Sequence, residues 1–292
     1  MKEIVFIINP FSGTSKKKNF QKTVEEKLDL SKYRPSFKYT EYPGHGTEIS
    51  REAVEQKKDI VVAVGGDGTI NEIARPLIHS HTTLAIIPAG SGNGFSRHLN
   101  IPMNVGRAIE IINAEEVWNI DTCTVNGTFY INVAGLGFDA KIAYLTKNNN
   151  QRGFFPYFQA TMQESFSYDL ADLVIKADDQ VVTGRYIAAI VANASRYGYQ
   201  FTVAPKAKIT DGIVDVILIK EAPVYRYFIS AYRFLNKTIH KSRLVDTIQA
   251  REVSIKSKRP TYMHIDGEVQ EPGTEFNFQI QPASLRVIAR TV

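Results

Sequence analysis

Residues 60–69 read IVVAVGGDGT, and this stretch decides the fold class of a chain of 292 residues. Its apolar half, Ile60–Val64, is typical of a strand that is buried on both faces of a sheet. Its other half, Gly65–Thr69, has three glycines in four positions, which lets the backbone approach a bulky anion and point successive N–H groups at it. A helix that starts there adds the positive end of its dipole. The stretch therefore predicts a strand–turn–helix unit that binds a nucleotide phosphate. The simpler alternative is a tight turn in which Asp67 caps the helix.

The sequence on either side of this unit repeats its pattern. Further strands are predicted at Ile4–Ile8, Phe37–Tyr39 and Leu84–Ile87. One helix is predicted to bury Phe20, Val24 and Leu28, and another to span Thr47–Lys57 with Thr47 as its N-cap. Strands that alternate with helices over short connections are typical of a parallel sheet with helices on both faces. Residues 1–120 are therefore predicted to form a three-layer α/β domain.

The second half of the chain has a different rhythm. Asn126-Gly127 separates two short β-type runs, as in a hairpin with a two-residue turn, and Asp178-Asp179 separates two more. Further strands are predicted at Ile213–Ile219, Val253–Ser257, Tyr262–Ile265, Phe276–Ile280 and Leu285–Ala289. One clear helix, Val224–Ile239, interrupts them. Residues 121–285 are therefore predicted to form an antiparallel, β-sandwich-like domain.

Composition sets limits on the class of protein. The chain is 43% hydrophobic and 22% charged, which is typical of a folded globular protein and excludes disordered and collagen-like chains. A net charge of +5 permits an anionic partner such as a membrane surface, and no nucleic-acid partner is expected. The lone Cys123 cannot form an internal disulfide, which favours a reducing compartment. Because no apolar run is long enough to span a membrane, we expect a cytoplasmic protein that touches membrane at most from outside.

Two more glycine-rich or turn-forming segments follow predicted strands. The first turn is Asn9–Gly13, the second is Gly65–Thr69 described above, and the third is Pro88–Phe95, which reads PAGSGNGF. The carboxyl ends of parallel strands meet at one edge of the sheet, so the three turns are expected to converge on one crevice. Ser91 and Asn93 can donate hydrogen bonds to phosphate or ribose oxygens. Asp67 suits a Mg²⁺ that bridges to the phosphates, because hard cations take carboxylate oxygens.

Other nucleotide motifs are absent from the sequence. It contains no G-x-x-x-x-G-K-[ST], which argues against a P-loop nucleotidase. It also lacks G-x-G-x-x-G at the first strand and an H-R-D-type loop, which argues against a Rossmann dehydrogenase and a protein kinase.

The ordered set of motifs resembles the diacylglycerol kinase catalytic-domain family, which includes bacterial lipid kinases and the sphingosine and ceramide kinases. The resemblance rests on Asn9-Pro10-x-x-Gly13, Gly65-Gly66-Asp67-Gly68-Thr69 and Pro88-x-Gly90-Ser91-x-Asn93. It continues through Gly135-x-Gly137-Phe138-Asp139, Asp211-Gly212 and His264-Ile265-Asp266-Gly267-Glu268, so it covers nearly the whole chain. It implies an ATP-binding domain and a lipid-binding domain with the active site in the cleft between them. It also implies that residues 286–292 could return to the first domain.

The resemblance also implies roles for individual residues. Asp67 and Glu268 are the candidates for the general base, with Asp67 also placed near Mg²⁺. The residues implied for ATP binding are Asn9, Pro10, Phe11, Ser12, Gly13, Thr40, Gly65, Gly66, Asp67, Gly68, Thr69, Glu72, Gly90, Ser91 and Asn93. A structural Mg²⁺ site is implied at Asp211 and the backbone oxygens of Lys208 and Ile213. At that site the chain has Thr210-Asp211-Gly212, where one bacterial branch often has Asp-Asp-Gly.

The expected activity is transfer of the ATP γ-phosphoryl group to the hydroxyl of diacylglycerol or of a related lipid such as a sphingoid base. Two alternatives stay open: an NAD kinase-like enzyme, which shares Gly65–Gly68, and a catalytically silent lipid- or nucleotide-binding protein. The aromatic stretch that contains Phe154, Phe155 and Phe158 is a candidate membrane contact, and packing into a core is an equal alternative. The family also makes a homodimer plausible.

Overall fold

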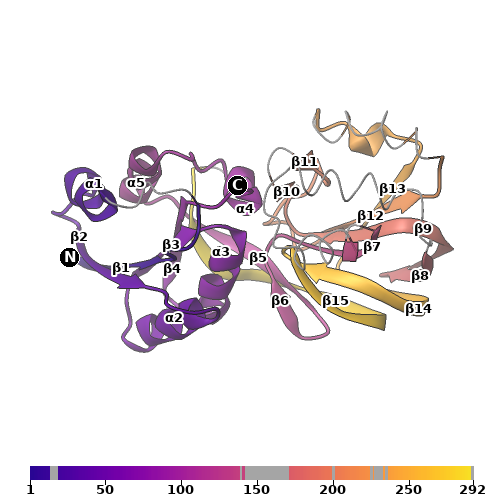
Figure 1. Ribbon diagram of the computed structural model, residues 1–292, viewed down its shortest axis with the longest axis horizontal. Coiled ribbons are helices and arrows are strands. Elements are labelled where there is room, and N and C mark those ends of the chain that lie inside the picture. The colour runs from indigo at the N-terminus through magenta and orange to yellow at the C-terminus, as the bar shows by residue number, and fades with distance from the viewer. Residues whose placement is uncertain are drawn as a thin grey trace. The chain divides into compact units, whose positions relative to one another are not determined.

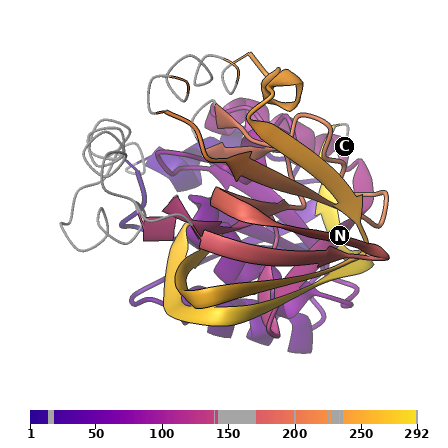
Figure 2. The ribbon, with the colours of Figure 1, turned by 90° about the vertical axis from the view of Figure 1, so that its right-hand side faces the viewer.

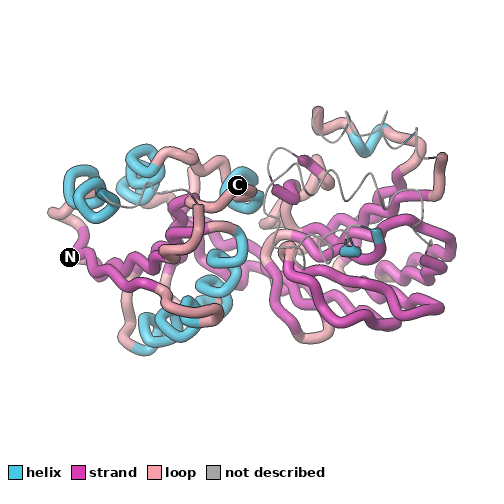
Figure 3. Tube along the Cα trace, viewed as in Figure 1, coloured by secondary structure: helices cyan, strands magenta, loops and turns pink. Residues whose placement is uncertain are grey.

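A computed structural model describes residues 1–13, 19–138, 140–141, 171–198, 201–223, 226, 233 and 236–290 of the chain. The chain divides into two compact units: Met1–Asp121 together with Pro282–Val292, and Thr122–Gln281. Within the described ranges, most helices belong to the first unit and strands dominate the second (Figure 3).

The sheet of the first unit is parallel, as predicted. It contains β1 (Lys2–Ile8), β2 (Tyr33–Tyr39), β3 (Ile60–Gly65), β4 (Thr83–Pro88) and the end of β15 (Glu268–Ile288), in the order β15-β4-β3-β1-β2. Every residue of β3 is buried, which explains its continuous run of apolar side chains. Late in the chain, Val287 of β15 pairs with Leu84 of β4 and so adds a last strand to this sheet.

Helices cover both faces of this sheet (Figure 1). α1 (Phe20–Lys27) and α5 (Val105–Ala114) lie on one face, and α2 (His45–Glu55) and α3 (Asp67–Ala74) on the other; η2 (Arg75–Leu77) follows α3 directly, and the short α4 (Gly94–His98) follows β4. Phe20, Val24 and Leu28 are buried, as the helical spacing predicts. The Phe20 ring meets Phe6 of β1 edge to face, with 6.0 Å between the ring centroids.

The start of α2 differs from the prediction. The helix begins at His45, and its N-cap is Gly44, whose φ of +89° only glycine adopts without strain. Thr47 is therefore not the N-cap. Its hydroxyl instead donates to the Glu72 carbonyl oxygen at 2.9 Å and fastens α2 to α3. The Thr47 side chain, which the sequence pattern assigned to capping, makes a tertiary contact instead.

The second unit is built from antiparallel strands. It contains β5 (Val117–Val125, from Thr122 on), β6 (Thr128–Tyr130), β7 (Val133–Gly137), β8 (Ala171–Ala177), β9 (Gln180–Ala192), β10 (Arg196–Gly198), β11 (Phe201–Thr202), β12 (Val214–Lys220), η3 (Ile239–Lys241), β13 (Val245–Ala250), β14 (Glu252–Ile265) and most of β15. The order β13-β12-β9-β7-β14-β15 is antiparallel throughout, and β8 pairs with both β9 and β14. Figure 2 shows the long strands β8, β9, β14 and β15 together.

The two predicted hairpins are present. Asn126 and Gly127 both have positive φ, +48° and +80°, as a type I′ turn requires. Two pairs of predicted strands prove to be single long strands, however. The predicted strands Val253–Ser257 and Tyr262–Ile265 are both parts of β14, because its pairing with β15 shifts register around Pro260 and then resumes. β15 likewise runs through residues 276–288, with a positive φ of +49° at Ala283.

Candidate active site

The three predicted turns follow strands of the first unit that lie side by side. The first turn follows β1, the second follows β3 and the third follows β4, and these strands are neighbours in the order β4-β3-β1. The connection from β1 leads to β2 on one side, and the connection from β3 leads to β4 on the other. In an open parallel sheet, the crevice that opens where the connections diverge is the usual ligand site. By this rule the expected ligand site lies between the carboxyl ends of β1 and β3.

Backbone contacts too close for any larger residue bring the turns together. A Cβ built on Gly90 would lie 2.5 Å from the Gly66 Cα, so the second and third turns touch through their glycines. A Cβ built on Gly13 would lie 2.1 Å from the Ala89 carbonyl oxygen, and Gly13 also has a φ of +72°. The first and third turns therefore also meet backbone to backbone. The predicted convergence of the three glycine-rich turns is present in the first unit.

Asn9 ties the first turn to the second. Its Nδ2 donates to the Thr69 hydroxyl oxygen at 2.9 Å, and its Oδ1 accepts the Phe11 N–H at 2.9 Å. The Ser12 hydroxyl donates to the Asn9 carbonyl oxygen at 3.0 Å. The first turn is thus closed on itself and fastened to the start of α3, while the Phe11 side chain stays 72% exposed.

The Asp67 carboxylate links the second turn to the third. Asp67 is the first residue of α3, and its Oδ2 and Oδ1 accept the N–H groups of Gly94 and Phe95 at 3.0 and 3.1 Å. It therefore caps the beginning of α4 rather than its own helix, which the capping alternative had assumed. Each oxygen of a carboxylate has two lone pairs, so a carboxylate can accept hydrogen bonds and bind a cation at the same time. These residues fit a Mg²⁺ bound through one carboxylate and nucleotide phosphates, the mode that magnesium favours.

The Asn93 side chain is bonded within the third turn. Its side chain is 5% exposed, its Oδ1 accepts the Gly90 N–H at 2.9 Å and its Nδ2 donates to the Gly90 carbonyl oxygen at 2.7 Å. It also holds a φ of +51°. The Asn93 amide thus fixes the shape of the third turn, whereas the neighbouring Ser91 is exposed and accessible to a ligand.

The remaining predicted nucleotide residues border the same edge. Thr40 directly follows β2, and its N–H donates to the Ile8 carbonyl oxygen at 2.9 Å. Glu72 projects from α3 toward the start of α2, where a Cβ on Gly46 would lie 3.0 Å from its Oε2. Both lie within the first unit, so the structure gathers the predicted ATP-binding residues on one unit of the chain.

Glu268 lies in the second unit, directly after a tight turn. β14 and β15 are joined by Asp266 and Gly267, with φ of +48° and +86°, and Ile265 pairs with Glu268 across this turn. Glu268 is exposed. In a simple β-turn, the acidic side chains at residues 266 and 268 would both be exposed to solvent, but Asp266 is not. Its carboxylate accepts the N–H groups of Ile131, Asn132 and Val133 at 2.9–3.0 Å. Sequence reasoning missed this anchoring role, because the three N–H groups lie more than 130 residues earlier in the chain.

The predicted structural metal site is a turn before β12. Asp211 is exposed, and its Oδ1 accepts the Ile213 N–H at 3.3 Å. Among the residues that the structure describes, no three His, Cys, Asp or Glu side chains form a metal-binding group. A cation there would rely on one carboxylate and on backbone oxygens, as the missing second Asp of this segment already indicates.

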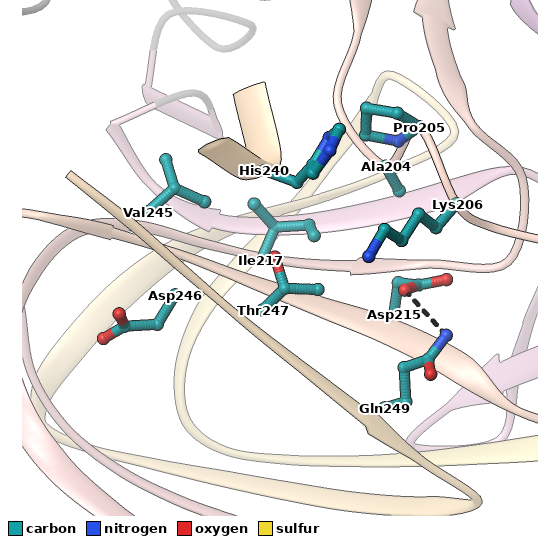
Figure 4. Close-up of a pocket in the computed structure, with 10 residues that line it drawn as sticks. All are labelled: Ala204, Pro205, Lys206, Asp215, Ile217, His240, Val245, Asp246, Thr247 and Gln249. Carbon is teal, nitrogen blue, oxygen red and sulfur yellow. Dashed lines mark hydrogen bonds between the residues drawn. The ribbon is translucent and has the colours of Figure 1, made fainter. Parts of the chain in front are cut away.

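A cavity of about 360 Å³ lies beside β12 in the same unit (Figure 4). Asp215, Lys206, His240 and Gln249 are among its polar residues, and Ile217 and Val245 are among its apolar ones. The Gln249 Nε2 donates to the Asp215 Oδ1 at 3.2 Å, and burial raises the pKa of the Asp215 carboxyl. Burial together with Lys206 lowers the pKa of His240.

Some predicted residues fall outside the described part of the chain. Phe154, Phe155 and Phe158 do so, as does Asp139. Most of the predicted helix Val224–Ile239 does so as well.

Two family models match the sequence almost end to end. The model of the diacylglycerol kinase catalytic domain matches residues 3–125, and the model of the YegS C-terminal NAD kinase beta sandwich-like domain matches residues 132–289. The chain belongs to the diacylglycerol kinase family. The resemblance predicted from the motifs is thereby confirmed, and so is the expectation of a lipid kinase.

Individual proteins support this membership. The chain is 27% identical over 274 residues to the diacylglycerol kinase of Bacillus subtilis (strain 168), covering 92% of this chain and 90% of that one. It is 26% identical over 284 residues to the diacylglycerol kinase of Staphylococcus saprophyticus, covering 94% and 92%. A crystal structure of a diacylglycerol kinase from Bacillus anthracis str. Sterne has the same fold, with a TM-score of 0.76, 20% identity and coverage of 99% and 97%.

Proposed function

We propose that this member of the diacylglycerol kinase family transfers the γ-phosphoryl group of ATP to the hydroxyl of diacylglycerol or of a related lipid such as a sphingoid base. The observation that carries the proposal is the contact of the three turns Asn9–Gly13, Gly65–Thr69 and Pro88–Phe95 at the carboxyl ends of β1, β3 and β4. The names of the relatives support the lipid acceptor, because diacylglycerol kinases from two bacterial genera align with nine-tenths of the chain.

The turns bind the triphosphate through their backbone. The N–H groups in the first turn of α3 have no partner within the helix, and such a helix start favours bound anions. Because Gly66 and Gly90 have no side chains, the second and third turns can touch and bring their backbone N–H groups close together. Ser91 adds a hydroxyl donor from the exposed part of the third turn. Thr40 and Glu72 complete the set of residues proposed to line the ATP site.

The transfer step makes one bond and breaks another. The lipid hydroxyl oxygen forms a bond to the γ-phosphorus, the bond from that phosphorus to the β,γ-bridging oxygen breaks, and ADP leaves. Glu268 accepts the hydroxyl proton, a contribution typically worth about 10²–10⁴-fold in rate. Asp67 would hold Mg²⁺, which would supply positive charge to the phosphates. The Asp67 carboxylate also links the second turn to the third.

The lipid is taken from a membrane surface. No helix within the described part of the chain is long and apolar enough to span a bilayer. A net charge of +5 suits peripheral contact with an anionic surface, and the aromatic residues Phe154, Phe155 and Phe158 suit the interface. A homodimer and a Mg²⁺ bound at Asp211 remain parts of the proposal that rest on the family alone.

A phosphoryl-transfer assay tests the function. Purified protein is incubated with γ-labelled ATP, Mg²⁺ and, in separate reactions, diacylglycerol, sphinganine, ceramide and NAD. We expect a labelled lipid in at least one of the first three reactions. Label in NAD alone, or ATP binding without transfer, would refute the proposal in favour of one of the two alternatives.

Matched variants test the base. Glu268→Gln removes the proton acceptor and should lower kcat by about 10²–10⁴-fold with the ATP KM little changed. Glu271→Gln makes the same chemical change at an exposed position of the same strand and should keep the wild-type rate. Equal rates for the two variants would remove Glu268 from the mechanism.

A further inference from the structure

The turn that carries Glu268 has support beyond its own strands. A two-residue turn at the end of a hairpin is ordinarily among the more mobile parts of a sheet. A group that must accept a proton needs a fixed position, because a misplacement of about 1 Å can cost on the order of 10²-fold in rate. The contacts that hold this turn are therefore part of the machinery if Glu268 is the base.

Asp266 anchors the turn on one side. Its carboxylate accepts three successive backbone N–H groups, from Ile131 to Val133, and its own N–H donates to the Val133 carbonyl oxygen at 2.9 Å. This ties the turn to the segment that leads into β7. Gly267, which lies between Asp266 and Glu268, takes no part in that set of bonds.

His264 holds Gly267. The imidazole is 1% exposed, and its Nδ1 accepts the Gly267 N–H at 3.3 Å. Because Nδ1 acts as an acceptor there, the ring proton of the neutral imidazole lies on Nε2. Nε2 then donates to the Tyr197 hydroxyl oxygen at 2.7 Å, and the two rings lie 5.3 Å apart. An aliphatic side chain could fill the same space but could supply neither bond.

We infer that His264, oriented by Tyr197, is a positioning residue that fixes the Gly267–Glu268 peptide for proton transfer from the lipid hydroxyl. The chain Tyr197–His264–Gly267 runs from β10 to the residue next to Glu268, and the Asp266 carboxylate ties the same turn to residues 131–133 at the start of β7. All these residues belong to the second unit. The inference rests on the proposed function, because His264 and Tyr197 can act as positioning residues only if Glu268 accepts the proton.

Three variants test the inference. His264→Leu removes both ring bonds. His264→Asn restores an acceptor near the position of Nδ1 for the Gly267 N–H. Tyr197→Phe removes only the hydroxyl. We expect kcat to fall by about 10–10²-fold in His264→Leu, to recover most of the loss in His264→Asn and to fall several-fold in Tyr197→Phe, while the KM for ATP changes less than about twofold.

A double variant separates positioning from a general loss of stability. If His264 acts through Glu268, adding His264→Leu to Glu268→Gln should lower kcat little further, since residues that act as a unit are not additive. Amide exchange should also be faster at Gly267 in His264→Leu than in the wild type. A buried core histidine with no positioning role would instead give a folded His264→Leu variant with kcat within twofold of the wild type, or equal losses in His264→Leu and His264→Asn. Either result overturns the inference. If His264→Leu does not fold, Tyr197→Phe decides, and an unchanged kcat there overturns it.

The outcomes separate the inference from the function itself. A wild-type protein that transfers no phosphate to any lipid refutes the proposed function. A wild-type protein that transfers phosphate and is slowed by Glu268→Gln, but not by the His264 and Tyr197 variants, refutes only the inference.

Discussion

Replacing Gly90 by Ala perturbs the candidate nucleotide site by a single methyl group. The new Cβ would lie 2.5 Å from the Gly66 Cα and 2.8 Å from the Asn93 Oδ1. The first neighbour is backbone, which cannot rotate away, and the second is the oxygen that accepts the Gly90 N–H. Ordinary contact distances are reached only if the second and third turns move apart by about 1 Å.

That displacement sets the expected magnitude. A misplacement of about 1 Å at a site that positions phosphates costs on the order of 10²-fold in rate, or about 2.7 kcal/mol of transition-state stabilisation. We expect kcat/KM for ATP to fall by roughly that factor and calorimetric ATP affinity to fall with it. Steady-state kinetics with the preferred lipid and titration calorimetry with ATP and Mg²⁺ measure the two effects.

Gly106→Ala is the matched control. It makes the same change in the same unit, within α5, where the nearest atom to the new Cβ would be the Asn104 Oδ1 at 3.4 Å. Alanine should stabilise that helix by up to about 1 kcal/mol and leave ATP kinetics unchanged. Gly90→Ala kinetics within twofold of the wild type would refute the argument that contact between the two turns shapes the phosphate site.

Two further predictions concern carboxylates. Asp67→Asn replaces one of the two acceptor oxygens with an NH₂ group that cannot accept an N–H. The free energy of unfolding in urea should therefore fall by about 1–3 kcal/mol, whereas Asp179→Asn at an exposed turn should leave it unchanged. Equal unfolding midpoints for the two variants would contradict the link between the second and third turns. Because burial raises the pKa of Asp215, the folded protein keeps that proton at pH values where the unfolded chain has lost it. Wild-type stability should therefore decline more steeply than that of Asp215→Asn as the pH rises above about 4, as urea unfolding at a series of pH values would show, and parallel curves would contradict it.

The sequence was sufficient for the parallel sheet and for the second, β-rich half, because both depend on patterns of period two or on unbroken apolar runs. β3 was predicted from Ile60–Val64, and the structure ends it at Gly65. The hairpin at Asn126-Gly127 was predicted because this dipeptide suits the positive φ of both turn residues. Strand ends were harder: the register shift near Pro260 interrupts the pairing without ending β14, and nothing local distinguishes the two cases.

The candidate site shows the same division. The convergence of the three turns was predicted because a close approach of two backbones requires glycine, which is visible in the sequence. The partners of polar side chains were not, because those partners lie far away in the sequence. Asp67 binds N–H groups 27 and 28 residues later, and Asp266 binds N–H groups more than 130 residues earlier. Asn93 was predicted to bind the nucleotide; its amide is bonded to Gly90 in its own turn, and a contact with the nucleotide stays a prediction. The expected cleft between the two halves stays a prediction.

β15 has a consequence for how the protein is made. Residues 282–292 complete the first unit, and Val287 pairs with Leu84, whereas the rest of that unit ends at Asp121. During synthesis on the ribosome, the edge of β4 that pairs with β15 therefore stays unpaired until the whole β-rich unit has been made. A nascent chain halted before residue 282 would expose the unpaired edge of β4. A chaperone that binds strand edges would therefore be needed most during that interval.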